Sequence, residues 1–155
     1  MQQTTQGQKS GSDVLTVGLA QINNSFSGQN YLPYAIGLLQ AYAERHAEAP
    51  EKFRFLLPVY KRIKVDAAVE QLRDADAVGF SLYVWNERLT LEVARRLKAE
   101  KPNILIIFGG PQVPDRGEAF LRAHPFIDVA CHGEGEQTFL KLIERTRTRD
   151  FAEVQ

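Results

Sequence analysis

Four short stretches of small, amide-bearing or aromatic residues each follow an apolar run of the sequence. The first contains Asn23, Asn24, Ser25 and Gly28, the second Tyr83, Val84, Trp85 and Asn86, the third Gly109, Gly110, Pro111, Gln112 and Val113, and the fourth Gly133, Glu134, Gly135 and Glu136. Side-chain amides and hydroxyls hydrogen-bond to neutral polar groups, and glycine allows a close approach to the backbone. No Lys or Arg occurs in any of the four stretches. The stretches therefore suit a large, mostly uncharged ligand.

Several common ligand-binding patterns are missing from these positions. A nucleoside triphosphate site would need a glycine-rich loop with a Lys, and the dinucleotide fingerprint G-x-G-x-x-G would follow the first apolar run. Neither pattern is present there. A phospho-acceptor domain would need an Asp at the end of the third apolar run, where this chain has Ser81 and Leu82.

The elements that must position these residues alternate between strands and helices. Near-continuous apolar runs predict strands at 14–21, 53–59, 77–84, 104–108 and 127–131. Helical periodicity predicts helices over 31–46, from Val65 to Leu72, after an Asn86 N-cap, near 116–123, and around Phe139, Leu140 and Ile143. The first of these helices is expected to have Pro33 in its first turn, and Leu32, Ala35, Ile36, Leu39 and Ala43 on its core face.

This alternation predicts an α/β fold, a Rossmann-like or flavodoxin-like doubly wound sheet of five parallel strands in the order 2-1-3-4-5. Ligands of such sheets bind outside the carboxyl ends of the strands, and all four stretches would meet at that edge. Each stretch alone has an ordinary explanation: glycines in turns, Trp85 as a packing residue, and Glu134 and Glu136 as an acidic helix start. Their joint placement favours a ligand site.

Composition limits the class of protein. The 155 residues suffice for one domain, and 19 basic against 19 acidic residues argue against nucleic acid or an anionic membrane as a partner. No apolar run reaches the length of about 18 residues that a membrane span needs. Cys131 is the only cysteine, so no internal disulfide forms and a cytoplasmic location is expected. Residues 1–13 are polar and predict a flexible tail.

The segments "VGFSLYVWN", "ILIIFGGPQVP" and "HPFIDVACHGEGEQTFLKLIE" resemble the N-terminal cobalamin-binding domain of B12-dependent radical S-adenosylmethionine enzymes. The resemblance extends from about Val14 to Ile143 and implies that the four stretches and Ser81 contact cobalamin. Cobalamin domains in general have D-x-H-x-x-G after the first strand, S-x-L in the third and G-G after the fourth. Ser81 matches the serine, although Leu82-Tyr83 departs from S-x-L, and Gly109-Gly110 matches the glycine pair. A Cβ at either glycine is expected to block the nucleotide tail of the cofactor.

The first motif lacks its cobalt ligand in this chain. In register, D-x-H-x-x-G falls on Asn23, Ser25 and Gly28, so Ser replaces the histidine, and His46, His124 and His132 all lie elsewhere. The resemblance implies cobalamin bound with its own base off the cobalt and without His ligation. We hypothesise that the Trp85 ring lies beneath the corrin instead.

The resemblance also implies a second domain. A radical S-adenosylmethionine enzyme holds its 4Fe–4S cluster through three closely spaced cysteines, whereas this chain has only Cys131, expected to be buried in the fifth strand. Residues 14–149 are thus expected to be the cobalamin-binding domain and 150–155 the start of a linker. The cluster and S-adenosylmethionine would belong to a radical domain absent from this chain. The segment alone would be non-catalytic, and the full enzyme a methyltransferase acting on an unactivated carbon or a phosphinate.

Two alternatives remain open from the residues. Ser25 to Asn30 faintly resembles the S/T-x-T-G-x-T phosphate loop of flavodoxins, which would make the chain an FMN-binding electron carrier. A ligand-free interaction domain with the same fold is the other alternative. The colour of the purified or reconstituted protein separates the three.

Overall fold

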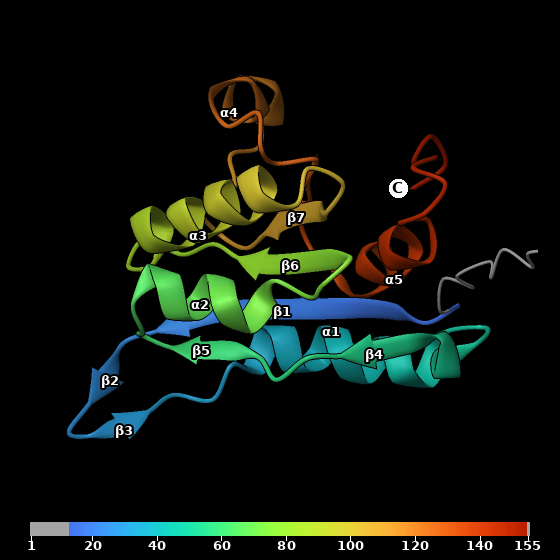
Figure 1. Cartoon of the computed structure of the whole chain (residues 1–155). Helices are drawn as coiled ribbons and strands as arrows, with labels where there is room; N and C mark the ends of the chain where they lie inside the picture. Colours follow the sequence, from blue (N-terminus) through green and yellow to red (C-terminus); the bar gives the residue numbers. More distant parts are fainter. Residues whose placement is uncertain (1–12, 155) are drawn as a thin grey trace, which may run out of the picture.

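The computed structural model describes residues 13–154 and contains a central parallel sheet with helices on both faces (Figure 1). The strands are β1 (Leu15–Asn23), β4 (Phe53–Phe55), β5 (Val59–Lys61), β6 (Ala77–Ser81), β7 (Leu105–Gly109) and β8 (Val129–Ala130). They lie in the order β4-β1-β6-β7-β8, and β5 also pairs with β1. The predicted order 2-1-3-4-5 is confirmed, with the second strand divided into two segments.

That division corrects the prediction of one strand over 53–59. Phe55 pairs with Val17 and Val59 pairs with Ala20, while the residues between Phe55 and Val59 leave the ladder. Pro58 has no N–H to donate to a neighbouring strand. Two other predicted strands are shorter than expected: the third ends at Ser81 and the fifth covers only Val129–Ala130.

The helices form two pairs. Helices α1 (Tyr34–His46) and α5 (Glu136–Glu144) pack against one face of the sheet, and α2 (Val65–Leu72) and α3 (Glu87–Glu100) against the other. A short helix, α4 (Gly117–Ala123), precedes β8, and a 3₁₀ turn, η1 (Pro50–Lys52), precedes β4. Every residue of β1 is buried, as expected for a central strand that is covered on both faces.

Helix α1 begins later than predicted. Residues 25–26 and 29–30 form a small antiparallel hairpin, β2 (Ser25–Phe26) and β3 (Gln29–Asn30), and the helix begins at Tyr34 rather than at residue 31. Pro33 is the N-cap rather than a first-turn residue. Leu32 is 82% exposed, so its assignment to the core face is wrong. Ile36 and Ala43 are buried as predicted.

The two ends of the described chain lie against the body of the domain. Of the predicted flexible tail, residues 1–12 lie outside the described residues, and Asp13 forms ion pairs with Lys52 at 3.5 Å and Arg147 at 3.1 Å. Phe151 and Val154 pack against the core between the sheet, α1 and α5, and the domain boundary expected at 149 stays a prediction. No helix within residues 13–154 has the length and apolar character that crossing a membrane requires.

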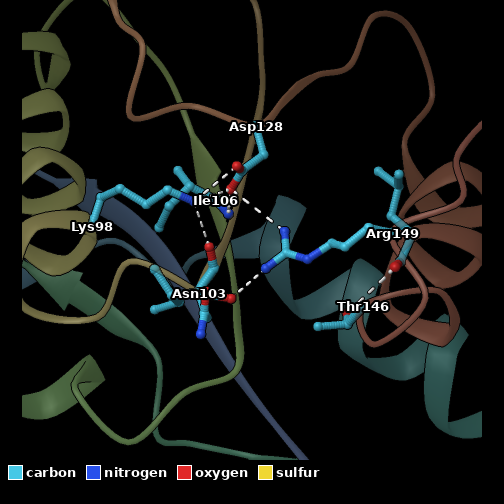
Figure 2. A network of polar contacts seen from close by, with 8 residues as sticks. Lys98, Asn103, Ile106, Asp128, Thr146 and Arg149 are labelled. Atoms are coloured by element: carbon cyan, nitrogen blue, oxygen red, sulfur yellow. Dashed lines mark hydrogen bonds and ion pairs between the residues drawn. The ribbon is translucent and has the colours of Figure 1, made fainter.

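A polar network joins the amino ends of β7 and β8 to α3 and to the segment after α5 (Figure 2). The Asp128 carboxylate accepts hydrogen bonds from the Ile106 N–H at 2.7 Å and from Lys98 Nζ at 2.8 Å. Arg149 lies 3.8 Å from the same carboxylate and also donates to the Asn103 carbonyl. This network lies at the edge of the sheet opposite the carboxyl ends of the strands.

Candidate functional site

A cleft of about 520 Å³ opens at the carboxyl ends of β6 and β7, beside the first turns of α1 and α5. Several predicted site residues line it: Ser81, Tyr83, Gly109, Gly110, Pro111, Val113, Gly133, Glu134, Gly135 and Glu136. Three of the four predicted stretches therefore meet at one cavity. The register explains this meeting, because Ser81 at the end of β6 pairs with Gly109 at the end of β7.

The other predicted residues lie outside the lining of this cleft: Asn23, Asn24, Ser25, Gly28, Val84, Trp85, Asn86 and Gln112. Asn23 is buried at the end of β1, whereas Asn24, Ser25 and Gly28 are exposed. Ser27 and Gly28 have φ values of 49° and 75°, as a type I′ hairpin turn requires. The loop after β1 is a hairpin that projects from the end of that strand (Figure 1), and its contact with the ligand stays a prediction. Residues 25–30 thus do not form a phosphate loop at a helix start, which removes the basis of the flavodoxin alternative.

The two motif glycines have different surroundings. A Cβ on Gly109 would have Cys131 Cβ as its nearest neighbour, 4.0 Å away, and would otherwise point into open space. Gly110 has φ +104°, and its Cβ would lie 2.7 Å from the Leu82 carbonyl oxygen and 2.8 Å from the Leu82 nitrogen. The expectation that a Cβ would block the cleft fits Gly109. It is wrong for Gly110, where glycine is required by the backbone itself.

Asn86 lies at the start of α3 and holds two strand ends together. Its side chain is buried, and Nδ2 donates to the carbonyls of Ile22 at 3.1 Å and Ser81 at 3.0 Å. Its Oδ1 accepts from the Tyr83 N–H at 2.9 Å. Although it is the N-cap residue, it makes no side-chain capping bond to the helix. All of these bonds are within the protein, so the Asn86 amide shapes the site rather than facing a ligand.

Trp85 stacks on Tyr83, with ring centroids 4.5 Å apart and an angle of 15° between the ring planes. Tyr83 lines the cleft and Trp85 lies beside it, 43% exposed. An aromatic platform therefore extends from the cleft along the edge of the sheet. Val84, the residue between Tyr83 and Trp85 in the chain, is also an exposed apolar side chain.

Sequence reasoning missed the helical walls of the cleft. Ile36 and Leu39 of α1 and Phe139 of α5 line it together with Ile107 of β7. The periodicity of α1 indicated that Ile36 and Leu39 lie on an inward face, but not that part of this face borders a cavity.

Cys131 and His132 also line the cleft. Cys131 follows β8 rather than lying within it and is only partly buried, which corrects the expectation of a residue inside the fifth strand. Burial raises the pKa of the Cys131 thiol to about 11. The thiol is therefore neutral at physiological pH. Among residues 13–154, no group of three or more His, Cys, Asp or Glu residues is arranged to hold a metal ion.

A cation also lies at this edge, in a loop that sequence reasoning did not include. Arg62 follows β5, and its Nη1 donates to Asn24 Oδ1 at 3.2 Å and to the Trp85 carbonyl at 3.1 Å. Because the second strand was predicted to end at residue 59, the cationic residues Lys61, Arg62 and Lys64 were not recognised as belonging to the edge. The loop after the second strand would have identified them, since every parallel strand of the sheet ends at the same edge.

These features define a doubly wound α/β domain with a ligand cleft at its carboxyl edge. The chain belongs to the B12 binding domain family, which matches residues 5–143. It is 39% identical over 120 residues to the cobalamin-dependent radical SAM methyltransferase TokK of Streptomyces tokunonensis, covering 77% of this chain and 18% of that protein. It is 36% identical over 140 residues to the 2-(S-pantetheinyl)-carbapenam-3-carboxylate methyltransferase of Streptantibioticus cattleyicolor, covering 90% of this chain and 20% of that protein. The chain thus spans about a fifth of the length of these relatives.

Proposed function

We propose that this chain binds cobalamin with the nucleotide tail in the cleft, the base off the cobalt and no histidine ligand from the protein. The observation that carries this proposal is the cleft at the carboxyl ends of β6 and β7, beside the motif residues Ser81 and Gly109. Its volume of about 520 Å³ is that of a small-molecule site. Family membership supports cobalamin as the ligand.

The residues of the cleft fit the tail of the cofactor. Ile36, Leu39, Ile107 and Phe139 provide apolar walls for a flat heterocycle. Open space lies over Gly109, where a Cβ would project into the cavity. Ser81 and Gly133, which carry polar groups, line the same cavity. When bound, cobalamin supplies a cobalt centre that carries and transfers a methyl group.

No histidine is placed by the first motif to reach a corrin from below. Ser25, in the histidine's register position, lies on the exposed β2–β3 hairpin. His46 stacks on Tyr42 at the end of α1, and His124 packs against Phe120 and Phe126 near α4. His132 lines the cleft that we assign to the nucleotide tail, away from the position of the first motif. Trp85, stacked on Tyr83 beside the cleft, is the residue that we assign to the lower face of the corrin. Its indole nitrogen carries a proton and cannot ligate cobalt, but the ring excludes water.

The whole enzyme is proposed to be a radical S-adenosylmethionine methyltransferase. The names of the two relatives describe methyltransferases, one of them a cobalamin-dependent radical enzyme. The iron–sulfur cluster would belong to another part of the enzyme, because Cys131 is the single cysteine of this chain. The role of the domain is to present the upper face of the cofactor to that part.

Titration of the 155-residue chain with hydroxocobalamin and with cobinamide, which lacks the nucleotide tail, tests the proposal. Hydroxocobalamin should co-elute with the protein in gel filtration, and cobinamide should bind at least about tenfold more weakly, equivalent to about 1.4 kcal/mol. The electron paramagnetic resonance spectrum of the bound cob(II)alamin should lack nitrogen splitting from a lower axial ligand.

Three results would each contradict one part of the proposal: cobalamin binding, the path of the tail, or the ligation of cobalt. Absence of bound cobalamin at high protein concentration would reject cobalamin binding by this domain. Equal affinities for cobalamin and cobinamide would show that the tail does not occupy the cleft. A nitrogen triplet in the spectrum would reject binding with the base off and without histidine.

A further inference from the structure

We propose that Arg62 is a positioning residue that ties the loop after β1 to the loop after β6 and so holds Trp85 at the rim of the cleft. One guanidinium nitrogen, Nη1, donates both to Asn24 Oδ1 at 3.2 Å and to the Trp85 carbonyl at 3.1 Å. Asn24 and Trp85 belong to two different predicted stretches. Arg62 comes from a third segment, between β5 and α2. The role in cofactor binding rests on the function proposed above, whereas the structural role does not.

The sheet register explains why Arg62 reaches both partners. Lys61, the last residue of β5, pairs with Asn23, the last residue of β1. The next residue in each segment is Arg62 and Asn24, so both leave the sheet side by side. Strand β6 pairs with the other side of β1, and its following loop brings Trp85 to the same edge. Arg62 thus joins the loops of two adjacent strands from outside.

Arg62 complements a buried connection between the same two loops. Inside the protein, Asn86 bonds to the carbonyls of Ile22 and Ser81 and to the Tyr83 N–H. On the exposed side, Arg62 bonds to Asn24 and to the Trp85 carbonyl. The stacked Tyr83–Trp85 pair is therefore held at both of its backbone positions: Tyr83 by Asn86, and Trp85 by Arg62.

Lysine is expected to reproduce this arrangement only in part. A guanidinium has five N–H donors in a planar fork, whereas an ammonium is a compact, strongly hydrated charge on a flexible stem. Holding two exposed acceptors from different loops favours the planar, pre-organised group. Comparing Arg62→Lys with Arg62→Gln therefore separates a requirement for arginine from a requirement for positive charge at this position.

The consequence for function is pre-organisation of the rim. Loops that must become ordered when a ligand binds reduce its affinity, and contacts that order them beforehand restore it. With Trp85 held in place, the aromatic platform beside the cleft exists before the cofactor arrives. Without Arg62, the platform would have to be ordered by the cofactor itself.

The fluorescence of Trp85 measures this directly, because it is the only tryptophan of the chain. We compare the parent chain with Arg62→Gln, Arg62→Lys and the control Lys64→Gln. Lys64 is an exposed cation of the same loop whose side chain forms no hydrogen bond or ion pair with other residues of the described range 13–154. Acrylamide quenching and fluorescence anisotropy are recorded without cofactor, and circular dichroism checks the fold.

Arg62→Gln should raise the quenching of Trp85 and lower its anisotropy, Arg62→Lys should do so to a smaller degree, and Lys64→Gln should match the parent. The affinity of Arg62→Gln for hydroxocobalamin should fall by about three- to tenfold, the scale on which one exposed charged contact contributes to binding.

Three results would overturn parts of this proposal. Parent-like fluorescence in Arg62→Gln would reject the positioning role, whether or not cobalamin binds. Altered fluorescence with unchanged affinity would show that the contact does not serve the cofactor. An equal change in Lys64→Gln would attribute the effect to charge. If the parent itself fails to bind cobalamin, the function proposed above is rejected, and the fluorescence still decides the role of Arg62.

Discussion

Gly109 and Gly110 are adjacent in the chain but have different structural roles. The space above Gly109 belongs to the cleft, with Cys131 Cβ at 4.0 Å as its nearest neighbour. Gly109→Val should therefore reduce cobalamin affinity at least about tenfold, because the branched side chain would fill the space assigned to the tail. The sheet interior is not altered, so the free energy of unfolding should change little. Binding titration and urea denaturation provide the two measurements.

Gly110→Ala is the matched variant for that test. Its φ of +104° and the 2.7 Å approach to the Leu82 carbonyl oxygen should destabilise the fold by about 1–3 kcal/mol, since a strained backbone position costs that amount. Parent-like cobalamin affinity in a folded Gly109→Val protein would contradict the assigned path of the tail. Parent-like stability in Gly110→Ala would contradict the role of Gly110 in the backbone.

The Cys131 thiol provides a prediction about pH. Burial raises its pKa from the usual 9.0 to about 11, so the folded protein favours the protonated form. Its contribution to stability is complete below about pH 9 and is lost as the pH rises through 11. Alkylation by iodoacetamide should therefore be slow at pH 8 and should rise steeply only toward pH 11. Bound hydroxocobalamin should slow it further, because Cys131 lines the cleft.

Mass spectrometry of the alkylated chain measures the rate, and a cysteine peptide serves as the control. A rate that reaches its plateau near pH 9 would contradict the raised pKa of Cys131. Equal rates with and without saturating cobalamin would contradict the position assigned to the cofactor.

At the level of elements, helix α1 receives a side-chain contact from the central strand β1 rather than from its own cap. Pro33 occupies the N-cap position and provides no side-chain capping bond. The Gln21 side chain of β1 accepts a hydrogen bond from the Ile36 N–H at 3.4 Å, within the first turn. Ile36 lines the cleft, so this contact places one wall of the site. Buried Gln21 thus links the central strand to the ligand edge.

The sequence predicted the elements well because apolar runs and helical periodicity report burial, and burial dominates this sheet. The sequence predicted the structure less well where pairing between short neighbouring segments determines the backbone path. The Ser27–Gly28 turn forms a hairpin, which moves the start of α1 to Tyr34 and exposes Leu32. Strands of only two residues are too short to show a hydrophobic period, so periodicity did not predict β2 and β3.

The candidate site was predicted from one topological rule, that parallel strands end at a common edge. That rule placed Ser81, Gly109 and Gly135 at one cleft. It could not place Phe139 there, because periodicity identifies an inward face but not a cavity beside it. It missed Arg62 because Pro58 divides the second strand, and the continuation of that strand from Val59 to Lys61 was not recognised.

At the scale of the whole molecule, the two edges of the sheet differ in character. The carboxyl edge holds the cleft, glycines and exposed aromatic side chains, whereas the amino edge holds the network around Asp128 (Figure 2). Lys98 and Asp128 are only 20% and 26% exposed, so their interaction is less screened than that of a surface pair. This separation predicts that stability at the amino edge can be changed independently of ligand binding.

Asp128→Ala tests that separation. The substitution leaves the Ile106 N–H, Lys98 and Arg149 without their shared acceptor and should lower the free energy of unfolding by about 1–3 kcal/mol. Glu70→Gln, which removes the exposed pair with Arg73, is the matched control and should cost no more than about 0.5 kcal/mol. Urea denaturation gives both values. Hydroxocobalamin affinity, measured where each variant is fully folded, should equal that of the parent, because the network lies at the edge opposite the cleft. A weaker affinity in Asp128→Ala would show that the two edges are coupled through the strands, and a loss of stability no greater than that of Glu70→Gln would show that the network does not hold the sheet together.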